Sequence, residues 1–128
     1  MHEASVRDVD PFDLPDWLGT GDVTWTAGTG LHTGHLVRGE LSGEDGRLTC
    51  DLLAADRAFP QPVLDEEWRR RAHQAWTYGQ VVLVDYDDRL TLAVPGTAFS
   101  AELALDAVGR LAKAVGARPG RFLVALRL

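Results

Sequence analysis

The sequence predicts an α+β domain of the ferredoxin-like class, in which an antiparallel sheet carries two helices on one face and an extra N-terminal β-hairpin. Two observations lead to this prediction. Short segments of alternating apolar and polar residues predict strands, and two longer segments with apolar residues every three or four positions predict helices. From Arg47 onward these segments follow the order β-α-β-β-α-β, and right-handed crossovers would place both helices on one side of the sheet.

The expected domain organisation follows from the composition of the N-terminal segment. Residues 1–18 are rich in aspartate, contain Pro11 and Pro15, and show no steady periodicity, so we expect a flexible acidic tail. Residues 19–128 form the predicted single α+β domain, because a chain of 128 residues is long enough to bury one core.

Three strands are predicted to form an antiparallel meander at the start of this domain. Val23 and Trp25 alternate with threonines in the first strand, and a glycine-rich loop at residues 27–30 follows it. His35–Leu41 is the second predicted strand. The turn sequence Ser42–Gly46 separates it from the third strand, Leu48–Ala54.

The first helix is predicted to begin near Asp65, a favourable N-cap residue, and to end at Gly79. Acidic residues follow the cap, where the helix dipole favours them. One apolar stripe runs along this helix, formed by Trp68, Ala72, Ala75 and Trp76. The stripe predicts that the helix packs against the sheet along one side.

A hairpin, a second helix and a last strand complete the prediction. The continuous apolar run Val81–Val84 is typical of a strand covered on both faces, and two aspartates at 87–88 join it to Leu90–Val94. Ser100 is the expected N-cap of the second helix, and Gly116 is its expected terminator. Phe122–Leu126 alternates as a final strand.

Charge and cysteine content exclude several classes of partner. The formal net charge of −6 argues against a nucleic-acid ligand, which is bound mainly through clustered Lys and Arg, and against an anionic membrane surface. No apolar run approaches the roughly 20 residues that span a bilayer. The single cysteine, Cys50, cannot form an internal disulfide, which fits a cytoplasmic protein. The glycine-rich residues 28–34 precede a predicted strand rather than a helix, so no phosphate-binding cofactor is expected.

A metal site is one candidate. His32 and His35 lie beside the glycine-rich loop, and Cys50 or Asp51 on the next strand could complete a zinc site. Structural zinc sites usually contain more than one cysteine, however, and residues three apart on a strand point to opposite faces. The alternative interpretation is a pair of solvated turn histidines.

An aromatic pocket is a second candidate. Tryptophan side chains can line an apolar cavity between sheet and helices, His73 lies three residues before Trp76, and Asp85 ends an apolar strand. The predicted ligand-binding residues are Trp25, Trp68, His73, Trp76 and Asp85. The alternative is that these aromatic residues belong to an ordinary core, because their helical spacing suits one equally well.

Four phrases of the sequence are similar to those of a known family. They are Asp16–Gly19, Ala72–Trp76, Leu90–Thr97 and Leu111–Gly116. On these residues the chain resembles a family of small uncharacterised actinobacterial proteins over most of its length. The resemblance implies a bacterial source, which agrees with a composition poor in AT-rich codons, and it implies no activity and no functional residue.

The sequence contains no combination of acid, base, nucleophile or metal ligand that defines an activity. The leading functional hypothesis is therefore a non-catalytic cytosolic interaction module that self-associates as a homodimer, or binds another protein, through the face or edge of its sheet. The alternative is a small-molecule-binding protein or cofactor-free enzyme that uses the aromatic pocket. Whether the chain is an enzyme at all stays open, with the balance against catalysis.

Overall fold

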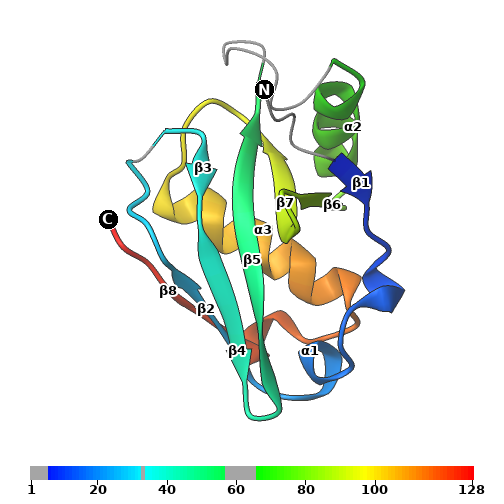
Figure 1. The fold of residues 1–128 in the computed structure, drawn as a ribbon, viewed down its shortest axis with the longest axis vertical. Helices are drawn as coiled ribbons and strands as arrows, with labels where there is room; N and C mark the ends of the chain where they lie inside the picture. Colours follow the sequence, from blue (N-terminus) through cyan, green and yellow to red (C-terminus); the bar gives the residue numbers. More distant parts are fainter. Residues whose placement is uncertain (1–5, 33, 57–65) are drawn as a thin grey trace.

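The structure is a computed structural model that describes residues 6–32, 34–56 and 66–128. Within these residues, eight strands form one mixed sheet in the order β1-β6-β7-β5-β4-β2-β8, and β3 also pairs with β5 (Figure 1). The strands are β1 (Val6–Asp8), β2 (Val23–Ala27), β3 (Leu36–Val37), β4 (Gly39–Gly43), β5 (Gly46–Ala55), β6 (Val82–Tyr86), β7 (Arg89–Pro95) and β8 (Phe122–Ala125). The α-helices are α1 (Trp17–Thr20), α2 (Glu66–Thr77) and α3 (Ala101–Ala114).

The predicted N-terminal meander is confirmed, with one change. Strand β4 pairs antiparallel with both β2 and β5, but the expected second strand is divided into β3 and β4. At the break the indole Nε1 of Trp25 donates a hydrogen bond to the main-chain oxygen of Cys50 at 2.9 Å. Opposite it, the Gly39 amide donates to the Asp51 carboxylate at 3.1 Å. Two side chains thus satisfy main-chain groups where the ladder is interrupted.

The predicted turns and helix ends are also confirmed where the structure describes them. Asp87 and Asp88 both adopt positive φ, 56° and 60°, as the tight turn between β6 and β7 requires. The Ser100 hydroxyl accepts a hydrogen bond from the Leu103 amide and caps α3. The expected N-cap of the first helix, Asp65, lies outside the described residues.

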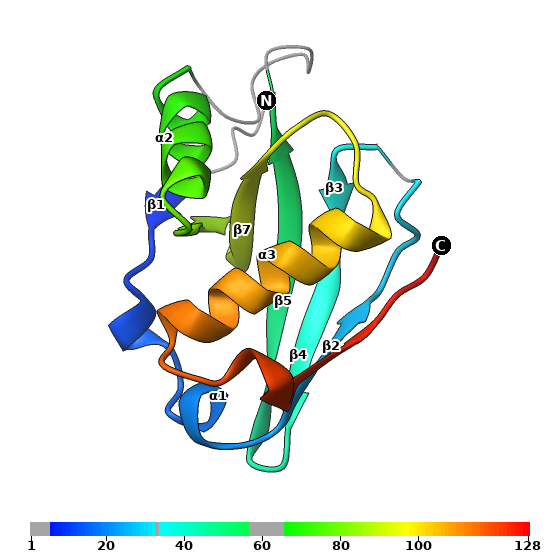
Figure 2. The same cartoon turned by 180° about the vertical axis from the view of Figure 1, so that it is seen from behind.

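The two long helices pack against opposite faces of the sheet. Alternate residues of a strand point to opposite faces, and those of β5 and β7 divide between two clusters of buried side chains. The cluster that contains Leu52 and Leu92 includes the buried residues of α3, which crosses the face shown in Figure 2. The cluster that contains Leu53 and Ala93 includes Ala72 of α2. The expectation of both helices on one face was wrong.

The ferredoxin-like prediction was wrong because the sheet is mixed and has more strands than that fold. Strand β5 pairs parallel with β7, and β8 pairs parallel with β2, whereas the ferredoxin-like order would place all neighbours antiparallel. The order of elements along a chain does not set strand direction, since a helical connection can return the chain to either end of a sheet. Here β8 extends the sheet beyond β2, so the N-terminal hairpin is an integral part of the sheet.

Part of the segment expected to be an acidic tail belongs to the sheet. Strand β1 pairs antiparallel with β6, and two ion pairs of 2.8 Å, Arg7 with Asp85 and Asp8 with Arg71, flank that pairing. The following helix α1 places Leu18 in the main core, where it is fully buried. Among the described residues, no helix has both the length and the apolar character needed to cross a bilayer.

Candidate functional site

The structure does not bring the predicted aromatic residues together around one cavity. Trp25 is fully buried beneath α3, and Trp68 packs in the cluster on the opposite face. Trp76 packs at the border of the α3 core, where the Arg110 guanidinium stacks 3.7 Å from its ring centre. Asp85 pairs with Arg7 near the β1 edge. These four residues contribute to packing and to surface ion pairing at separate places.

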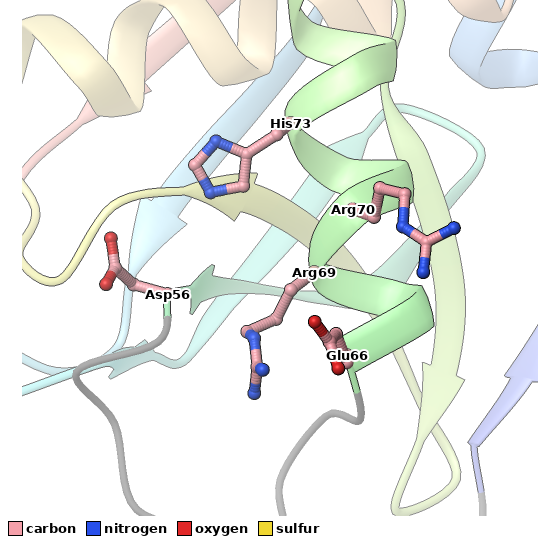
Figure 3. Close-up of a pocket in the computed structure, with 5 residues that line it drawn as sticks. All are labelled: Asp56, Glu66, Arg69, Arg70 and His73. Carbon is pink, nitrogen blue, oxygen red and sulfur yellow. The ribbon is translucent and has the colours of Figure 1, made fainter.

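His73, one of the predicted ligand-binding residues, lines a pocket. The pocket has a volume of about 370 Å³ and is lined by Asp56, Glu66, Arg69, Arg70 and His73. Figure 3 shows the side chains of His73, Asp56 and Arg69 directed toward a shared space, whereas Arg70 points away from it. The His73 Nε2 atom lies 3.2 Å from the main-chain oxygen of Ala55, at the end of β5. This contact fixes the ring at the rim of a pocket whose lining is charged rather than aromatic.

The predicted metal ligands do not form a cluster. His32 is exposed in the loop before β3, and His35, three residues later, is half-buried. Cys50 is fully buried on the α3 side of β5, while Asp51 points to the other face and pairs with Arg89. Among the residues that the structure describes, no group of three or more His, Cys, Asp or Glu side chains could hold a metal ion.

A part of the sheet that lies away from α2 and α3 is open to solvent and polar, and we call it the open sheet face. Its residues are exposed or half-buried and come from β2, β4 and the first half of β5: Thr24, Thr26, Glu40, Ser42, Arg47 and Thr49. The registers align them in two rows across the strands, Thr26-Glu40-Thr49 and Thr24-Ser42-Arg47. Figure 1 looks onto this face, with α3 behind the sheet.

A buried ion pair borders the open sheet face. Asp51 is 1% exposed, and its carboxylate accepts hydrogen bonds from Arg89 Nε at 2.7 Å and Arg89 Nη2 at 2.9 Å. The Gly39 amide donates to the same carboxylate. These hydrogen bonds to Asp51 raise the pKa of the Arg89 guanidinium, so it stays charged at any physiological pH. The bidentate geometry holds Arg89 in one orientation at the surface.

Two further arginines surround a recess beside this ion pair. Arg38 Nη1 lies 3.9 Å from the Asp51 carboxylate, and Arg47 Nε lies 3.9 Å from the Glu40 carboxylate. Both separations exceed hydrogen-bond length. The recess has a volume of about 440 Å³, and the three arginines, Glu40 and the hydroxyl residues Thr26, Ser42 and Thr49 line it together with Gly28 and Gly39.

One edge of the sheet carries an exposed apolar strand. Strand β8 lies at the end of the strand order, with β2 as its neighbour (Figure 1). Leu123 lies opposite Thr24 of β2, and its side chain is 66% exposed. The strand sequence Phe122–Ala125 is short, but it contains no charge and no proline, two of the features that protect such an edge.

Sequence reasoning missed both the arginine recess and the apolar edge. Arg38, Arg47 and Arg89 are far apart in the chain, and no local pattern connects them. Their proximity depends on the pairing of β5 with β7. Comparison of the chain with protein-family models, with curated proteins and with solved structures finds no match to any of them.

Proposed function

We propose that this protein is a non-catalytic, cytosolic interaction module that forms a homodimer through the edge of strand β8. The observation that carries the proposal is the exposed Leu123 side chain on an uncharged edge strand. An edge strand offers a row of main-chain donors and acceptors to another strand, and natural sheets usually block such a row with charges or proline. An unblocked apolar edge therefore favours association.

The charges near β8 favour one antiparallel register for two copies. A twofold axis at Leu123 would place the two Leu123 residues opposite each other and each Phe122 opposite the partner copy's Val124. An axis one residue later, at Val124, would place Arg121 opposite Arg127 of the second copy. Like charges directly opposite are destabilising, so the register centred on Leu123 is preferred.

The character of the open sheet face supports the edge as the contact. Threonine, serine, glutamate and arginine side chains occupy that face, and burying them against a second copy would require new partners for each polar group. The β8 edge requires only main-chain pairing and the burial of leucine. Association through the edge also extends one sheet across both copies.

The test is the molar mass in solution of the full chain, measured by analytical ultracentrifugation over a range of concentrations. The wild-type protein is expected to show a concentration-dependent dimer. The Leu123→Lys variant is expected to be monomeric, because a charge at an edge opposes strand pairing. The matched control is Leu105→Lys on α3, where the wild-type leucine is 51% exposed, and this variant should dimerise like the wild type.

Two outcomes would contradict the proposal. A wild-type protein that is monomeric at every concentration excludes self-association. A dimer that persists in Leu123→Lys, with the melting temperature of the variant unchanged, shows that another surface makes the contact.

The charged pocket at His73 favours a second candidate, a small-molecule-binding protein. Its lining combines the carboxylates of Asp56 and Glu66 with the Arg69 guanidinium and the His73 imidazole, a set that suits a ligand carrying both charges. A thermal-shift screen of amino acids and other zwitterions tests this candidate against the wild type and His73→Gln. A stabilising ligand that loses its effect in His73→Gln supports it, and the absence of any stabilising ligand removes it.

A further inference from the structure

We propose that the recess on the open sheet face binds a small, multiply charged oxyanion. Phosphate and carboxylate groups both accept paired hydrogen bonds from the planar guanidinium group of arginine, so the site would recognise either group. The recess is about 440 Å³, within the size range of pockets that hold metabolites. This site is independent of the β8 edge and of the His73 pocket.

Arg89 provides a pre-oriented donor at this site. Its Nε and Nη2 atoms bond to Asp51, and Nη2 also lies 3.4 Å from the main-chain oxygen of Gly39. These contacts fix the plane of the guanidinium before any ligand arrives and do not use its Nη1 atom. A donor that is already held in place loses little side-chain entropy on binding, so it adds affinity efficiently.

Arg38 and Arg47 supply two further donors. Each lies 3.9 Å from its nearest carboxylate, so neither of these two ion contacts is a hydrogen bond. The side chains are 44% and 79% exposed, and they can reorient toward a ligand at small energetic loss. Hydroxyl groups of Thr26, Ser42 and Thr49 complete the lining.

The local charge balance favours an anion on a chain that is acidic as a whole. Three guanidiniums surround the recess against two carboxylates, those of Asp51 and Glu40, whereas the whole chain carries a formal net charge of −6. The charges of Asp51 and Arg89 largely offset each other, and the Asp87 carboxylate also acts on Arg89. The two remaining arginines, Arg38 and Arg47, still outnumber the single carboxylate that lines the recess, that of Glu40.

Isothermal titration calorimetry of the full chain with inorganic phosphate, pyrophosphate and citrate, each at low ionic strength, tests the site. Arg38→Gln and Arg47→Gln are each expected to weaken binding about tenfold, the effect of one charge-assisted hydrogen bond. Arg118→Gln removes the same charge from an exposed residue outside the recess and should leave the affinity unchanged. Arg89 is left intact, because its removal would leave Asp51 buried and unpaired.

The three titrants also distinguish the source of the oxyanion. Tighter binding of pyrophosphate than of citrate assigns the site to phosphate-bearing molecules, and the reverse order assigns it to polycarboxylates. The proposal is overturned if none of the three anions binds, or if Arg118→Gln weakens binding as much as Arg38→Gln and Arg47→Gln do. The molar mass and the anion affinity of the wild-type protein are measured separately, so failure of the dimer and failure of this site are separate results.

Discussion

The indole ring of Trp25 lies directly against Gly39, so closely that a methyl group on the glycine would come within 2.6 Å of three ring atoms. The ring is fully buried, and its Nε1 hydrogen bond to Cys50 holds it at the break between β3 and β4. It cannot withdraw without losing that bond and its place in the core. The contact leaves no room for a side chain at the first residue of β4.

Gly39→Ala is therefore expected to lower the free energy of unfolding by about 1–3 kcal/mol or more, the range for overpacked cores. Gly109→Ala is the matched control, because α3 has open space at that position and alanine favours a helix by about 1 kcal/mol over glycine. Urea denaturation measures both. Equal stability of Gly39→Ala and wild type would show that the ring moves freely.

Arg89→Met is expected to destabilise the protein by about 3–5 kcal/mol, because it leaves the buried Asp51 carboxylate without its main partner. The double variant Asp51→Val/Arg89→Met removes both charges. It should be more stable than Arg89→Met alone, although the Gly39 amide loses its acceptor. Denaturant titration of Arg89→Met, Asp51→Val and the double variant measures the coupling energy between the two side chains. If the destabilisation of the double variant equals the sum of the two single effects, Asp51 and Arg89 do not stabilise each other.

The stability of the protein is expected to fall at alkaline pH because of Cys50. Burial raises the pKa of its thiol, and the nearby Asp51 charge adds to the effect. The folded protein thus keeps a proton that the unfolded chain releases above about pH 8.5, and stability decreases there by up to about 1.4 kcal/mol per pH unit. Below about pH 8.5 the thiol is protonated in both the folded and the unfolded protein, and Cys50 causes no loss of stability.

Cys50→Ala should remove this pH dependence while lowering stability at neutral pH through the small cavity it creates. Unfolding free energies measured between pH 7 and pH 10 test the difference in slope. The same burial predicts that the native thiol does not react with Ellman's reagent until the protein is unfolded. Rapid modification of the folded protein would contradict the placement of Cys50.

Leu18→Ala is expected to cost about 2–5 kcal/mol, since this fully buried leucine belongs to the main core. Leu105→Ala, which truncates a half-exposed leucine, should change stability by less than about 0.5 kcal/mol. Thermal and urea denaturation measure the contrast. Equal small effects would mean that α1 does not anchor the N-terminal segment.

The elements with local signals could be predicted from the sequence. The turn at Asp87 and Asp88 and the cap at Ser100 depend on residues within a few positions of each other, and both predictions hold. Strand pairing depends on distant residues instead. Nothing near Phe122 indicates that it lies beside Val23, almost one hundred positions earlier and in the same direction.

For the candidate sites too, local residues could be interpreted from the sequence, whereas contacts between distant residues could not. The alternation of Thr24 and Thr26 with Val23 and Trp25 predicted a strand at residues 23–26 but not what its outer side faces. The arginine recess required a pairing between residues that are 38 positions apart, Asp51 and Arg89, which no local pattern encodes. Apolar character alone also could not separate a core tryptophan such as Trp25 from one that lines a pocket.

The buried carboxylate of Asp51 has a consequence for how β5 aligns with β7. From Leu52 to Ala55, β5 is buried and apolar on both faces, as is most of β7, so hydrophobic burial of these segments alone would tolerate a shift of one residue between the strands. Such a slip would turn Asp51 into the core beneath α3 and remove it from Arg89. The ion pair thereby distinguishes the native alignment from its nearest competitor, a role in specificity that a stability measurement by itself would not reveal.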